Sequence, residues 1–176
     1  MSLRIPIAAF ALGAGFFFSS IPSISETSSS EEFRVLAKDE IGLSLNSVEK
    51  YLSDGDEFFA RGDFDKARKK FDKAREMSKL LLGFYRDLGN SFKGIDARIP
   101  REMDSNSRKV LSLISRANLK LAILFRKTNR PELAVPLLVE VVRISSPANL
   151  EGQEAYQTLV ELGFVNTTYR GARKRL

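Results

Sequence analysis

The chain has 176 residues, which is enough for one domain of ordinary size with a core of its own. It contains no Cys and no His, and this excludes disulfides, thiolate nucleophiles, imidazole acid–base catalysis and the usual zinc, haem and iron–sulfur sites. Hydrophobic residues make up 43% and charged residues 28% of the chain, and the net charge is +6, so the composition is that of a folded protein.

Carboxylates that bind Mg²⁺ or Ca²⁺ are the metal chemistry that remains open to this chain. The sequence has neither a calcium-binding loop nor a phosphate-binding glycine motif. We therefore predict that the protein is not an enzyme and that it uses no cofactor and no metal.

Residues 1–25 have the layout of a secretory signal. Arg4 precedes an apolar run from Ile5 to Phe18, and a polar stretch with Pro22 follows. The run is shorter than the roughly 20 residues that span a bilayer, although counting through Ile24 just reaches that length. We expect either a cleaved signal peptide or a retained membrane anchor; a buried N-terminal helix is the remaining alternative.

Acidic residues follow the apolar run, and this charge bias places the folded part of the chain on the periplasmic, lumenal or extracellular side of a membrane. Serine and glutamate dominate the start of residues 26–45. Such a composition is typical of a flexible linker. The protein is thus expected to be exported or membrane-anchored, with a linker before its folded domain at residues 46–165.

Two amphipathic helices joined by a tight turn are predicted for the start of that domain. Asn46 or Ser47 is a natural N-cap for the first helix, which stops near Gly62. Gly62 and Asp63 supply the turn and the next cap. The second helix carries an apolar stripe made of Phe64, Ala67, Phe71, Ala74 and Met77. Because the turn is so short, the two helices must pack antiparallel.

Small and aromatic residues in this segment resemble a tetratricopeptide repeat (TPR) in their spacing, at Gly55, Phe58, Gly62, Phe64, Ala67, Phe71 and Ala74. Gly55 and Ala67 would let the helices approach closely, while the aromatic side chains would fill the seam between them. Two positions depart from the family pattern. Tyr51 stands at the early large aromatic position, and Lys79 replaces the usual final proline. We therefore expect the second helix to continue, through Leu82.

The pattern breaks between Gly83 and Asp104, where several glycines and Pro100 predict an irregular connection before a helix that starts near Arg101. The separation of Ala67 and Ala134 along the chain is close to twice the period of a tetratricopeptide repeat, which is about 34 residues. On this interpretation the middle repeat has degenerated.

A second helical hairpin is predicted from Ser107 to Ser145. Its first helix has a stripe at Val110, Ile114, Ala117, Leu121 and Leu124, and Phe125 and Ala134 have TPR-like spacing. Residues 132–144 are apolar nearly all round, contain Pro136 and are rich in β-branched residues, so a buried strand competes with a kinked helix. We favour the helix, because no other segment offers a strand to pair with it and Pro131 suits a helix start.

The last predicted helix covers residues 150–162 and ends before Gly163, which suits the C′ position. It resembles the capping helix of a repeat array. Residues 166–176 form a basic tail with Arg170, Arg173, Lys174 and Arg175. The complete prediction is an all-α fold: a short TPR-like array of antiparallel hairpins, closed by a capping helix and preceded by a hydrophobic leader.

The TPR resemblance implies a groove lined by the first helix of each hairpin, which would hold a peptide or helix of a protein partner. The positions that would face the groove are Glu49, Leu52, Asp56, Phe59, Arg116, Leu119, Ile123, Arg126 and Lys127. The four apolar ones would anchor the partner, although core packing is the alternative for them. Arg126 and Lys127 would face an acidic segment. Leu52 and Asp56 replace residues that clamp a terminal carboxylate in some family members, so we predict no such clamp.

A polar segment within residues 96–108 is the second candidate site. It concentrates six charged residues, at Asp96, Arg98, Arg101, Glu102, Asp104 and Arg108. The alternative is a solvated helix start, with Pro100 at the first helical position and the acidic residues near the N-terminus.

These features favour a non-enzymatic scaffold or assembly factor that acts at or beyond a membrane, for instance on a membrane protein complex. Two alternatives remain. One is an exported enzyme or ligand-binding protein that uses residues 96–108. The other is lipid or nucleic-acid binding by the basic tail, where nucleic acid is disfavoured because Tyr169 is the sole aromatic residue among the charges. The sequence specifies no oligomeric state.

Overall fold

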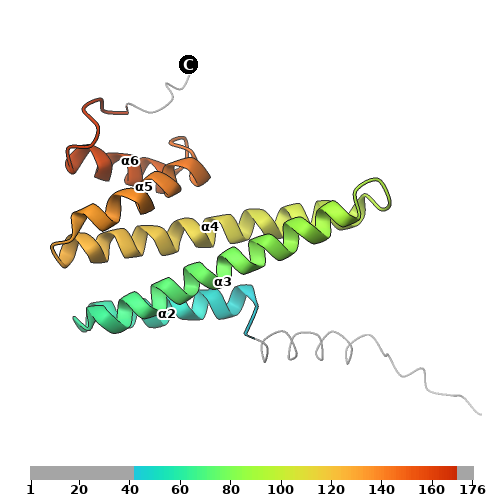
Figure 1. Ribbon diagram of the computed structural model, residues 1–176, viewed down its shortest axis with the longest axis horizontal. Helices are drawn as coiled ribbons and strands as arrows, with labels where there is room; N and C mark the ends of the chain where they lie inside the picture. The colour runs from blue at the N-terminus through green and yellow to red at the C-terminus, as the bar shows by residue number, and fades with distance from the viewer. Residues whose placement is uncertain (1–41, 170–176) are drawn as a thin grey trace, which may run out of the picture.

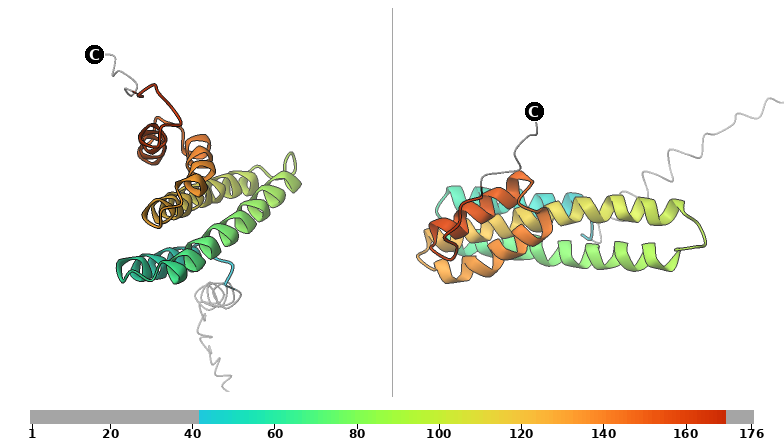
Figure 2. Two further views of the ribbon diagram at one scale, coloured as in Figure 1. Left: turned by 60° about the vertical axis from the view of Figure 1, so that its left-hand side comes forward. Right: turned by 90° about the horizontal axis from the view of Figure 1, so that it is seen from above.

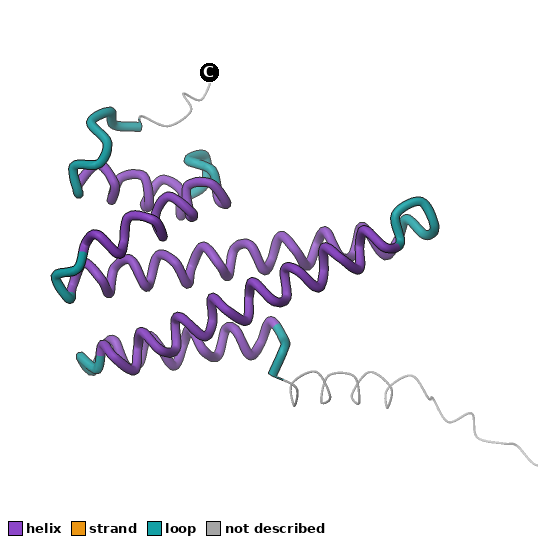
Figure 3. Tube along the Cα trace, viewed as in Figure 1, coloured by secondary structure: helices purple, strands orange, loops and turns teal. Residues whose placement is uncertain are grey.

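The computed structural model describes residues 42–169; the leader, most of the linker and residues 170–176 lie outside this range. The described part is all-α and contains no strand (Figures 1 and 3). The prediction of an all-α fold is confirmed, and residues 132–144 are helical. The helices are α2 (Leu45–Ala60), α3 (Phe64–Ser91), α4 (Arg98–Lys127), α5 (Pro131–Ser145) and α6 (Leu150–Glu161).

Consecutive helices alternate in direction, and each packs on the next (Figure 1). The long helices α3 and α4 form the centre of the molecule, with α2 on one side and α5 and α6 on the other (Figures 1 and 2). Helix α4 also contacts both α2 and α6, so it touches every other described helix. Within residues 42–169, no helix combines the length and apolar composition that crossing a membrane requires.

The first two helices begin at residues whose side chains satisfy free backbone groups. The N-cap of α2 is Ser44, which accepts a hydrogen bond from the backbone N–H of Ser47 at 3.0 Å. The predicted cap at Asn46 or Ser47 is therefore too late in the chain, because Ser47 itself lies in the first turn. The turn after α2 is as predicted: Gly62 has a φ of 80°, and Asp63 caps α3 by accepting from the N–H of Lys66 at 3.2 Å.

Helix α3 extends to Ser91, so the expected end near Leu82 and the irregular connection from Gly83 are wrong. Gly83 and Gly89 do not break the helix, because packing against α4 outweighs their low helix propensity. A Cβ on Gly89 would lie 3.1 Å from the Cβ of Met103 in α4, so the glycine allows the two helices to approach closely. Buried Leu81 and Tyr85 hold this part of α3 against α4.

Helix α4 begins at Arg98, before the predicted start near Arg101 and well before Ser107. Pro100 lies in its first turn, where the missing N–H costs nothing because that group has no intrahelical partner. The real connection between α3 and α4 is residues 92–97. A single long pair of helices therefore occupies the place of the expected degenerate repeat.

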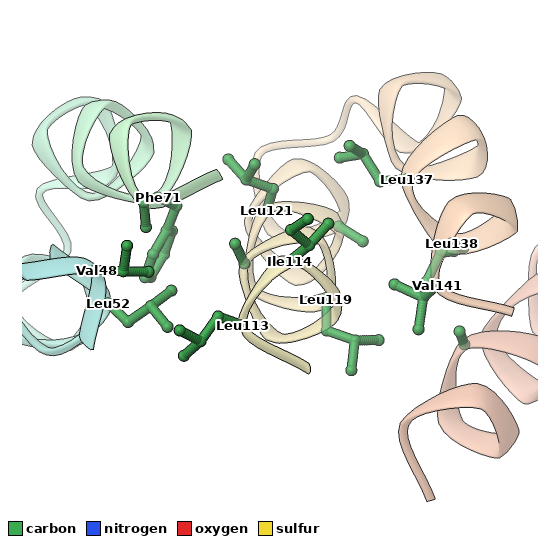
Figure 4. Close-up of a cluster of buried hydrophobic side chains, with 14 of the residues drawn as sticks. Val48, Leu52, Phe71, Leu113, Ile114, Leu119, Leu121, Leu137, Leu138 and Val141 are labelled. Carbon is green, nitrogen blue, oxygen red and sulfur yellow. The ribbon is translucent and has the colours of Figure 1, made fainter. Parts of the chain in front are cut away.

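The core runs along both sides of α4 (Figure 4). Val48, Leu52 and Phe71 pack from α2 and α3 against one side, and Leu138 and Val141 of α5 pack against the other. Each fully buried apolar side chain stabilises the fold by about 1.5–3 kcal/mol relative to an exposed one. Gly55 lies directly against the Phe71 ring, and a Cβ there would overlap ring atoms.

Helices α5 and α6 complete the described fold. Pro131 occupies the first position of α5, and the internal Pro136 is exposed. Helix α6 ends at Glu161, and Gly163 follows with a φ of 77°. Gly152 is buried against the backbone carbonyl of Ser146, which brings α6 close to the end of α5.

Candidate functional site

Helices α2 and α4 are not consecutive in the chain, yet their polar sides meet and form one surface of the molecule. Residues three, four or seven apart share one side of a helix, which places each set of three side chains in a row. We call this surface the α2–α4 face and define it by Glu49, Asp56 and Phe59 of α2 with Arg116, Lys120 and Ile123 of α4.

A hollow of about 180 Å³ lies on the α2–α4 face. Its lining is part apolar and part charged, with Phe59 and Ile123 beside Asp56 and Lys120, and Phe71 of α3 at its floor. Ile123 is 43% exposed, whereas Phe71 is buried. The hollow has room for one apolar side chain of a partner, with a charge of either sign next to it.

Ion pairs cross the α2–α4 face. The ammonium of Lys120 lies 2.6 and 2.8 Å from the two carboxylate oxygens of Asp56, and the guanidinium of Arg116 lies 4.0 Å from Glu49. All four side chains are at least a quarter exposed to solvent. Pairs of this kind contribute about 0–1 kcal/mol each, so a partner's charges can replace them at little cost.

The structure brings together five of the nine residues predicted for the groove: Glu49, Asp56, Phe59, Arg116 and Ile123. Leu52 and Leu119 are 1% and 7% exposed and belong to the core, which is the alternative interpretation given for them.

The two remaining predicted groove positions, Arg126 and Lys127, are not among the residues that define the α2–α4 face. Arg126 is exposed and pairs with Glu161 of α6 at 3.2 Å; Lys127 is exposed. Lys120 is the member of the face that sequence reasoning missed. Its spacing of four residues from Arg116 was the available signal.

The second candidate segment is mostly helix rather than loop. Asp96 lies in the turn, where its carboxylate accepts from the backbone N–H of Arg98 at 2.9 Å and pairs with the guanidinium at 2.7 Å. These hydrogen bonds, from the Arg98 side chain first, hold the pKa of Asp96 below its ordinary value.

The other residues of this segment, Arg101, Glu102, Asp104 and Arg108, are exposed and spread along about 10 Å of α4. Their spread fits the helix-start alternative. Among residues 42–169, no group of three or more acidic side chains could hold a metal ion.

A larger depression lies between α3 and α5, across α4. Two hollows of about 670 and 460 Å³ share Glu140 and Arg143 in their linings, and we call the combined feature the α3–α5 groove. One hollow is lined along α3 by Arg68, Asp72 and Arg75, and the other by Lys79, Leu82 and Arg86. The sequence did not predict this groove, because its walls come from α3 and α5, which are separated along the chain by α4.

Glu140 holds the two walls of the α3–α5 groove together. Its carboxylate oxygens lie 2.8 Å from the guanidinium of Arg75 and 3.2 Å from the ammonium of Lys79, both on α3. Burial alone would raise the pKa of Glu140, but the hydrogen bonds from Arg75 and Lys79 outweigh it and hold this pKa below its ordinary value. The carboxylate is therefore ionised at neutral pH.

No protein-family model, curated protein sequence or solved structure matches the chain. The α2–α4 face and the α3–α5 groove are thus the features of the described residues from which a function can be inferred.

Proposed function

We propose that the chain is a non-enzymatic protein–protein interaction module, a scaffold or assembly factor, that binds a peptide or helix of a partner on the α2–α4 face. The observation that carries this proposal is the hollow between Phe59 and Ile123, flanked by Asp56 and Lys120. An apolar anchor in a pocket with charges at its rim is the usual anatomy of a peptide-binding groove.

The proposed relation to the tetratricopeptide repeat is supported by the packing of α2 on α3. Gly55 contacts the Phe71 ring directly, and Ala67 and Ala74 are fully buried. These are the close contacts that the resemblance implies for a helical hairpin. The lengths of α3 and α4, 28 and 30 residues, depart from that pattern. A repeat of about 34 residues contains two helices, so a helix as long as α3 or α4 leaves no room in it for a second helix.

Action at or beyond a membrane is part of the same proposal. It rests on the leader at residues 1–25, which lies outside the described residues. The alternative that assigns ligand binding to residues 96–108 has less support, because those side chains follow one helix instead of converging. Binding of lipid or nucleic acid by the tail rests on residues 170–176, which also lie outside the described range.

Site-specific photocrosslinking in native extract tests the proposal. A photoreactive residue replaces Ile123 on the α2–α4 face, and a matched control carries it at Ile95, which is 78% exposed at the far turn. We expect a defined crosslinked protein from position 123 only, and we expect Lys120→Glu to abolish it. Identical products from both positions, or a product that Lys120→Glu leaves unchanged, would refute the proposal.

A further inference from the structure

We propose that the α3–α5 groove is a second docking surface, which binds an acidic amphipathic helix of a partner protein. This surface lies across α4 from the α2–α4 face and shares no residue with it. The inference therefore stands or falls separately from the proposed function.

The groove has the length and shape for a helix. Its α3 wall extends from Arg68 to Arg86, which corresponds to roughly 27 Å of helix at a rise of about 1.5 Å per residue. Its floor is one stripe of α4, with Leu111 and Ile114 under one hollow and Leu121 and Phe125 under the other. A partner helix of about 15 to 18 residues would fill that length.

The charges of the groove determine the sign of the partner. Five cationic side chains line it, against the acidic Asp72 and Glu140: Arg68, Arg75, Lys79, Arg86 and Arg143. Asp72 already pairs with Arg68, and Glu140 pairs with Arg75 and Lys79. Arg86 and Arg143 have no ion pair within the described residues, and Arg143 lines both hollows. Electrostatic complementarity therefore requires a partner with carboxylates along one side.

Apolar side chains beside these charges make the required partner amphipathic. Leu133 and Val139 of α5 are 40% and 51% exposed and line the larger hollow together with Pro136. Solvent-exposed aliphatic side chains next to unpaired cations match a helix with leucine-like residues on one face and carboxylates on the next.

Polar atoms beneath the groove also lack partners. Arg75 Nε is enclosed and donates to no acceptor within the described residues, although the same guanidinium reaches Glu140. Asn118 follows Ile114 and precedes Leu121 on the floor stripe; it is fully buried, and neither amide atom has a hydrogen-bond partner there. Buried polar groups without hydrogen-bond partners are unfavourable.

The same surface is poorly suited to nucleic acid or lipid headgroups. The Phe125 ring is already stacked by the guanidinium groups of Arg68 and Arg130, 5.5 and 5.6 Å from its centroid, and so offers no free platform for a base. The exposed Leu133 and Val139 need an apolar partner that a headgroup layer does not supply.

A peptide display library tests this inference. Helical peptides of about 16 residues, the length that fills the groove, are selected for binding to the full chain. The Arg86→Glu/Arg143→Glu variant serves for counter-selection. We expect the enriched peptides to carry Glu or Asp on one helical face and aliphatic residues on the adjacent face. Fluorescence anisotropy should show at least tenfold weaker binding to the double variant. Lys93 is exposed in the turn between α3 and α4, at residues 92–97. The Lys93→Glu variant serves as the charge-reversal control and should bind the peptides like the wild type.

Three results would overturn the inference. The enriched peptides could lack acidic residues, they could bind the double variant as well as the wild type, or Ile123→Glu on the α2–α4 face could weaken them equally. Single-stranded DNA and phosphatidylglycerol vesicles are measured in parallel, and preferential, Arg143-dependent binding of either would replace the protein partner by that ligand class. Circular dichroism of each variant establishes that it is folded; if the double glutamate variant is not, Arg143→Gln and Val139→Asn replace it.

Discussion

At the scale of single residues, Glu140 has the most definite energetic role. We expect Glu140→Gln to destabilise the protein by about 1–2 kcal/mol at pH 7, because it removes the charge that Arg75 and Lys79 surround while both cations stay partly exposed. The folded-state pKa of Glu140 is lowered, so its stabilisation is complete above its ordinary value of 4.5 and is lost as the pH falls through the folded-state pKa. Urea unfolding of both proteins at pH 7 and pH 3 measures this, and a difference that persists undiminished at pH 3 would contradict it.

Two glycines of α2 and α3 provide a matched pair with opposite expectations. Gly→Ala within a helix normally stabilises by about 0.5–1 kcal/mol, and Gly83→Ala should do so, because an added Cβ there meets nothing within 4 Å. Gly55→Ala should instead destabilise by about 1–3 kcal/mol, since its Cβ would overlap the enclosed Phe71 ring. Thermal unfolding distinguishes the two, and a shift of the same sign for both variants would disprove the packing role of Gly55.

At the scale of helices, local sequence signals predicted which elements exist better than where they end. The caps and stripes around Gly62 and Asp63 place the turn between α2 and α3 correctly, because these signals act within a few residues. Gly89 and Pro100 instead predicted an irregular connection, whereas both residues lie within helices. Gly89 is explained by its contact with Met103 of the next helix, and such a tertiary contact is not visible in a local pattern.

The long pair formed by α3 and α4 should be unevenly stable along its length. Its outer end projects beyond α2, α5 and α6 (Figure 1), and Tyr85 and Met103 are among the few apolar residues buried there. Less burial means that this end opens at lower free energy. Hydrogen–deuterium exchange should therefore be faster in residues 86–91 and 98–104 than in residues 64–81 and 114–127. Uniform protection along both helices would contradict this expectation.

At the scale of the whole molecule, the candidate surfaces differ in how far sequence could predict them. Helical spacing places Glu49, Asp56 and Phe59 on one side of α2, so most of the α2–α4 face could be predicted from the sequence, although Lys120 was missed. The same spacing could not separate Leu52 and Leu119 from that row, since burial depends on how the neighbouring helices cover them. The α3–α5 groove depends on the angle at which α5 crosses α4, and no local pattern in the sequence specifies that angle.

Because α4 touches every other described helix, the helical part should unfold as one cooperative unit rather than repeat by repeat. Val48 of α2 and Val141 of α5 are fully buried on opposite sides of α4 (Figure 4). Alanine at either position should cost about 1–3 kcal/mol and move a single transition to lower urea concentration with an unchanged slope. Circular dichroism reports all helices, whereas tyrosine fluorescence reports Tyr51, Tyr85 and Tyr156 in three of them and Tyr169 after α6. If Val48→Ala separated the two signals into two transitions, α2 and α3 would form an independent unit, and the role assigned to α4 would be wrong.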